Sequence, residues 1–87
     1  MDREQIRFFL YGVDSCPFCN HAEDYFLATG TEYYYFNYKD DPAGLAHCKS
    51  FFQHETVPII IINNKTTGES SFVGGYTDLM EHVEKND

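Results

Sequence analysis

The chain has 87 residues, with 14 Asp and Glu against 6 Lys and Arg, and a formal net charge of −8 at pH 7. This length fits one domain spanning residues 1–87, and the acidic balance argues against nucleic acid as a partner because phosphate binding needs a basic face. No segment approaches the ~20 consecutive apolar residues of a membrane span, and the polar N-terminus does not have the pattern of a signal peptide. We therefore expect a cytoplasmic protein that binds neither nucleic acid nor membranes.

The first half of the chain predicts a strand, a helix and a second strand. Residues 7–13 are almost entirely apolar, which is typical of a buried strand. Pro17 suits the first turn of a helix, where its missing N–H costs no hydrogen bond, and Gly30 favours the end of that helix. Aromatic residues dominate the stretch 32–38, which predicts the second strand.

A second helix and a third strand follow. Asp41 is a helix-capping residue and Pro42 is a first-turn proline, so a helix is expected to begin here and to run to about residue 54. The β-branched run 57–62 predicts the third strand.

The last part of the chain predicts a hairpin and a helix. Residues 63–68 have the composition of a turn, longer than a short hairpin needs, and 69–73 predict a return strand. Thr77 or Asp78 is expected to cap the last helix. The order is therefore β-α-β-α-β-β-α, an α/β domain with a four-stranded mixed sheet and three helices on its two faces. The first two strands should be parallel, through a right-handed crossover, and the last two antiparallel.

Two cysteines separated by two residues follow the first predicted strand, in the sequence Cys16-Pro17-Phe18-Cys19. At a helix N-terminus, free backbone N–H groups and the helix dipole favour the thiolate of Cys16, which is the nucleophile of disulfide exchange. In a reducing cytoplasm such a pair is more often catalytic or metal-binding than structural. A second pair of zinc ligands is absent from the sequence. We therefore predict a redox-active dithiol and no metal site.

Two other candidate residues have ordinary structural interpretations. Cys48 shares an apolar stripe with Leu45 and Phe52, which predicts a buried small hydrophobic residue. His21 lies two residues beyond Cys19, and helical periodicity predicts that its side chain points to solvent.

Three separated motifs together resemble the dithiol glutaredoxins, which have the thioredoxin fold. They are Cys16-Pro17-Phe18-Cys19, Thr56-Val57-Pro58 and Gly74-Gly75-Tyr76-Thr77-Asp78. The resemblance spans essentially the whole chain and implies a monomeric glutathione-dependent oxidoreductase that reduces protein disulfides and glutathione mixed disulfides. Glutathione would be its co-substrate, without a tightly bound cofactor, and ribonucleotide reductase would be among its client proteins.

The same resemblance implies a role for each motif. Cys16 would be the attacking thiolate and Cys19 the resolving thiol. A cis Val57–Pro58 bond would expose the backbone of Val57 to the cysteinyl part of glutathione. The N-terminus of the last helix would hold the γ-glutamyl carboxylate, and Asp78 the glutamyl ammonium. The implied glutathione-binding residues are Phe18, Thr56, Val57, Pro58, Gly75, Tyr76, Thr77 and Asp78.

One position departs from the family pattern. The family usually has Lys or Arg three residues before the first cysteine, whereas this chain has Val13, followed by Asp14. We therefore expect the activation of Cys16 to rest mainly on the helix N-terminus. Glutathione should bind more weakly or use another anchor, such as Lys49 or Gln53.

Two alternative functions retain the same fold. The first is an iron–sulfur carrier in which two subunits and two glutathiones hold a cluster; Pro17 disfavours this function because it stiffens the turn after the first cysteine. The second is a glutaredoxin-like protein that thioredoxin reductase recycles, and the glutathione-holding segment 74–78 argues against it.

Overall fold

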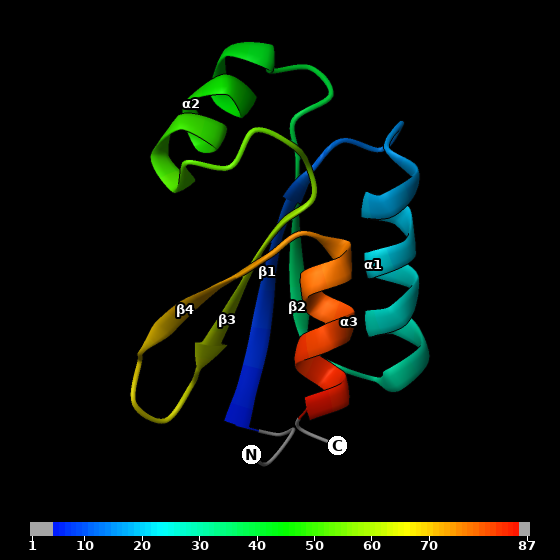
Figure 1. Cartoon of the computed structure of the whole chain (residues 1–87), viewed down its shortest axis with the longest axis vertical. Helices are drawn as coiled ribbons and strands as arrows, with labels where there is room; N and C mark the ends of the chain where they lie inside the picture. Colours follow the sequence, from blue (N-terminus) through cyan, green and yellow to red (C-terminus); the bar gives the residue numbers. More distant parts are fainter. Residues whose placement is uncertain (1–4, 86–87) are drawn as a thin grey trace.

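The computed structural model describes residues 5–85, which form one mixed α/β domain (Figure 1). The elements in chain order are β1 (Ile6–Gly12), α1 (Pro17–Thr29), β2 (Tyr33–Asn37), α2 (Pro42–Phe52), β3 (Ile59–Asn64), β4 (Ser70–Gly74) and α3 (Tyr76–Lys85). The order β-α-β-α-β-β-α and the four-stranded mixed sheet confirm the prediction from the sequence. Within the described residues, no helix is long and apolar enough to cross a membrane.

The strands lie in the order β2-β1-β3-β4. β1 is parallel to β2, with Phe8 opposite Tyr33, and antiparallel to β3, with Phe8 opposite Ile62. β3 and β4 form an antiparallel hairpin with a register shift between Ile60 and Ile61. Both predicted strand relationships are therefore present.

The two faces of the sheet are covered by different helices. Alternate residues of a strand point to opposite faces, so Leu10 and Tyr11 of β1 face different helices. The buried core on the first face includes β1, α1, β3 and α3 residues, namely Phe8, Leu10, Ala22, Phe26, Ile60, Ile62 and Leu79. On the second face, the ring of Tyr11 lies 5.7 Å from that of Phe52 at the end of α2. Figure 1 accordingly shows α1 and α3 beside each other and α2 near the upper end of the sheet.

α2 is shorter than predicted. The helix ends at Phe52 because Gln53 adopts a left-handed conformation with φ 53°. The N–H of Gln53 donates to the Ser50 carbonyl, and the N–H of His54 donates to the Lys49 carbonyl. These two hydrogen bonds pair carbonyl groups in the last turn of the helix, and the chain then leaves toward β3.

The hairpin turn is also shorter than the predicted range 63–68. Asn63 and Asn64 belong to β3, since Asn63 pairs with Ser70 across the hairpin. The side-chain oxygen of Asn64 accepts hydrogen bonds from the N–H groups of Thr66 and Thr67, at 2.9 and 3.1 Å. The loop between the two strands therefore comprises residues 65–69, and the side chain of Asn64 stabilises it by accepting hydrogen bonds from the backbone that follows.

Candidate active site

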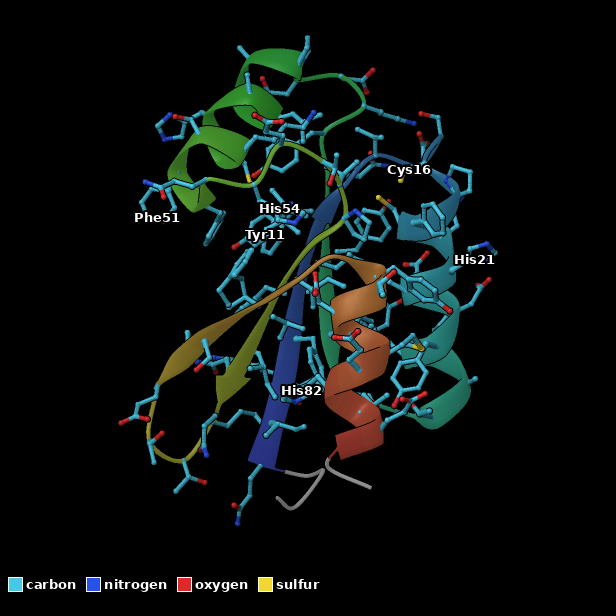
Figure 2. The ribbon with its side chains drawn as sticks, in the orientation of Figure 1. Tyr11, Cys16, His21, Phe51, His54 and His82 are labelled. Atoms are coloured by element: carbon cyan, nitrogen blue, oxygen red, sulfur yellow. The ribbon has the colours of Figure 1, made fainter. Side chains whose placement is uncertain are left out.

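Three connections meet at one end of the sheet: β1 to α1, α2 to β3, and β4 to α3. Cys16 is in the first of them, as the N-cap residue of α1. Its Sγ accepts a hydrogen bond from the Cys19 N–H at 3.4 Å and lies 3.7 Å from the Val57 carbonyl oxygen. The sulfur thus takes the place of a capping oxygen at the N-terminus of the helix. Figure 2 shows Cys16 at the upper end of α1.

Cys19 lies almost one turn further into α1 and is fully buried. Burial, followed by a hydrogen bond with Cys16, raises the pKa of the Cys19 thiol to about 12. This thiol therefore remains protonated at neutral pH. The two cysteines are both free, and they differ in accessibility: Cys16 is partly accessible and Cys19 is buried.

The second connection brings the backbone of Val57 to Cys16. The Val57–Pro58 peptide bond is cis, which confirms the expectation from the sequence. Just before it, the carbonyl oxygen of Thr56 accepts a 2.7 Å hydrogen bond from Nδ1 of His54. The His54 ring therefore fixes the course of the chain between α2 and the proline.

The third connection leads into α3, which begins at Tyr76. The prediction of Thr77 or Asp78 as the cap is therefore wrong, since both lie within the first turn. The carboxylate of Asp78 accepts a 2.9 Å hydrogen bond from the N–H of Gly75, the residue before the helix. Asp78 therefore stabilises the helix start from within the first turn, and does not precede the helix as a capping residue would. The first-turn N–H groups remain at the positive end of the helix, which favours an anion there.

These connections enclose a groove beside Cys16. Its lining residues are Phe18, His54, Thr56, Val57, Pro58, Gly75, Tyr76, Thr77 and Asp78. All eight residues that the sequence indicated for binding lie in this lining. His54 is the ninth and was missed, because the left-handed Gln53 that turns it toward the groove leaves no clear signal in the sequence.

A family profile for glutaredoxins matches residues 8–66. The chain belongs to the glutaredoxin family. A search of curated protein sequences finds no significant match. Solved glutaredoxins share the fold. Glutaredoxin 1 from Francisella tularensis has 20% sequence identity and a TM-score of 0.68, and the match covers 92% of this chain and 94% of that one. A buckwheat glutaredoxin–glutathione complex has 18% identity and a TM-score of 0.73, and the match covers 97% of this chain and 76% of that one. Family and fold support thiol-disulfide oxidoreductase chemistry at the two cysteines.

This glutaredoxin has an aromatic wall along the groove. Phe18, 56% exposed, stacks on Tyr76 with a centroid distance of 5.9 Å. His21 is exposed, as predicted, yet its ring lies 6.1 Å from that of Phe18 and 5.8 Å from that of Tyr76. Figure 2 shows His21 on the outer side of α1. The His21 ring therefore packs against the two aromatic rings of the groove, Phe18 and Tyr76.

The position that usually carries a cation in glutaredoxins is Val13 here, and the adjacent Asp14 forms an exposed ion pair with Lys39 at 3.7 Å. The predicted replacement anchors, Lys49 and Gln53, do not line the groove beside Cys16. They lie in a neighbouring hollow that shares His54 with it.

Cys48, the third cysteine of this glutaredoxin, is buried in α2, as predicted. Burial raises the pKa of its thiol. It lies on the Tyr11 side of the sheet, whereas Cys19 contacts the other side at Gly12. Cys48 is therefore separate from the dithiol.

Proposed function

We propose that this chain is a glutathione-dependent oxidoreductase that reduces glutathione mixed disulfides and protein disulfides. The observation that carries the proposal is the position of Cys16 Sγ, 3.7 Å from the backbone of Val57, at the side of the groove that continues to the N-terminus of α3. A tripeptide thiol bound along this groove would present its sulfur to the one accessible sulfur of the dithiol.

The lining of the groove matches the chemistry of glutathione. The backbone of Val57 can pair with the cysteinyl main chain, as an added strand does. The free N–H groups of Thr77 and Asp78 can receive the γ-glutamyl carboxylate, and the second oxygen of Asp78 the glutamyl ammonium. The buckwheat glutaredoxin with the same fold is a complex with glutathione.

The reaction divides into two exchanges. The Cys16 thiolate attacks a mixed disulfide, and the client or small thiol leaves as a thiolate, so that Cys16 carries glutathione. A second glutathione attacks this adduct and releases oxidised glutathione. With a protein disulfide, Cys19 attacks instead and closes the Cys16–Cys19 bridge, which glutathione then reduces.

Part of the proposal rests on the family resemblance alone. From this resemblance we propose that the protein is a monomer and that it works in the reducing cytoplasm. Its clients would be enzymes with reducible disulfides, such as ribonucleotide reductase.

The electron donor provides the decisive test. The protein is assayed on a small glutathione mixed disulfide with glutathione, glutathione reductase and NADPH, and separately on a protein disulfide with thioredoxin reductase and NADPH. We expect turnover in the first system and only background in the second. Turnover with thioredoxin reductase alone contradicts the proposal, and so does a coloured, cluster-loaded protein that is inactive in both.

A further inference from the structure

The hydroxyl of Tyr35, on β2, is an unpaired polar group inside the protein. Its oxygen is buried and has no hydrogen-bond partner among the described residues 5–85. Burying a hydroxyl without a partner costs free energy, so such a group calls for a physical explanation. The neighbouring Tyr33, on the same face of the strand, has a partner: its hydroxyl donates to Glu23 at 2.9 Å.

The unpaired hydroxyl lies next to the resolving thiol. Gly12, the last residue of β1, separates the two groups: an ideal β-carbon on it would overlap Cys19 Sγ and lie 3.8 Å from the Tyr35 hydroxyl oxygen. Any larger residue would fill this space. The Cys19 sulfur and the Tyr35 hydroxyl oxygen therefore both lie near the position that a side chain on Gly12 would occupy.

The chemistry of the dithiol gives this hydroxyl a use. Cys19 must lose its proton before it can attack, and burial opposes this because it disfavours a charged sulfur. A hydrogen-bond donor beside the sulfur lowers that cost. Tyr35 retains its own proton, since burial and nearby acidic groups raise its pKa; these groups are Cys19, Glu23, Cys16 and Asp14. It can therefore act as a donor and not as a base.

We propose that Tyr35 is a positioning residue for the resolving thiol: its hydroxyl donates a hydrogen bond to the Cys19 sulfur as that thiol loses its proton. This inference rests on the proposed dithiol route. In the step concerned, the Cys19 sulfur bonds to the Cys16 sulfur and the bond between Cys16 and the client sulfur breaks. The client leaves with that electron pair and takes up the proton from Cys19, so the cysteine pair is oxidised and the client disulfide is reduced.

The test follows this single step. The reduced protein is mixed with one equivalent of an aromatic disulfide that releases a coloured nitrothiobenzoate when Cys16 attacks and again when Cys19 attacks. In Tyr35→Phe we expect the second release to slow roughly tenfold, equivalent to about 1.4 kcal/mol of barrier, while the first stays within about twofold. The slowing should diminish at alkaline pH, as Cys19 ionises without help. Tyr33→Phe, which removes a hydroxyl that already has a partner, should change neither rate.

Stability separates this role from a structural one. Because the Tyr35 hydroxyl has no partner, Tyr35→Phe should leave the Tm unchanged or higher while it slows the second release. Equal second-release rates in Tyr35→Phe and wild type would overturn the inference alone. A slower reaction with glutathione mixed disulfides when Tyr35→Phe is added to Cys19→Ser would also overturn it, since no resolving thiol remains. Single release by the wild type would overturn the dithiol route and this inference together.

Discussion

Cys16→Ser is expected to abolish the reduction of a glutathione mixed disulfide, with a loss of roughly 10³-fold or more, the scale on which enzymes lose activity with their nucleophile. A serine hydroxyl does not ionise at neutral pH, and Cys19 cannot replace Cys16 because it is fully buried and its pKa is raised to about 12. The measurement is the glutathione-coupled turnover of a small mixed disulfide.

The other two cysteines provide the matched controls. Cys19→Ser should retain the reduction of glutathione mixed disulfides, which needs one thiol, and lose the reduction of protein disulfides, which needs two. Cys48→Ala should change neither activity, because Cys48 lies on the other side of the sheet from the dithiol. Activity that survives in Cys16→Ser, or that disappears in a folded Cys48→Ala, contradicts this assignment of roles.

Phe26→Ala has the largest expected effect on stability, a loss of about 3–5 kcal/mol in the free energy of unfolding. Phe26 is fully buried, and its ring stacks on Phe8 and Tyr33 with centroid distances of 4.8 and 5.3 Å. The substitution leaves a cavity between α1 and the sheet, and it removes a large share of a stability that is typically about 5–15 kcal/mol. Urea unfolding measures the loss.

The adjacent residue is the control for this substitution. Leu27 is 63% exposed, so Leu27→Ala should change the free energy of unfolding by no more than about 0.5 kcal/mol. Similar losses in the two variants would show that α1 is not held to the sheet through Phe26. The distinction matters for the site, since α1 also carries both cysteines of the dithiol.

Most of the fold could be predicted because its signals are local. Apolar runs mark β1 and β3, prolines mark the first turns of α1 and α2, and Gly30 ends α1 with φ 68°. The two helix ends that were misplaced depend on contacts that no pattern displays. One is the left-handed Gln53 after α2, and the other is the carboxylate of Asp78, which reaches back to Gly75.

The candidate site was predicted where motifs mark it and missed where only folding brings residues together. The Cys16–Cys19 pair, the Thr56–Pro58 segment and residues 75–78 all meet at one end of the sheet, as their motifs indicate. His54 and Tyr35 belong to no motif. His54 enters the groove after the left-handed Gln53. The Tyr35 hydroxyl lies near Cys19 only because both groups adjoin Gly12, which has no side chain.

If Cys16 exchanges disulfides with glutathione, a variant without the resolving thiol should retain the mixed-disulfide intermediate. The Cys19→Ser variant is incubated with oxidised glutathione, and its peptides are analysed by mass spectrometry. We predict one glutathione per chain, attached to Cys16 and removed by added reduced glutathione. A chain without an adduct, or an adduct confined to Cys48, would show that Cys16 does not exchange disulfides with glutathione.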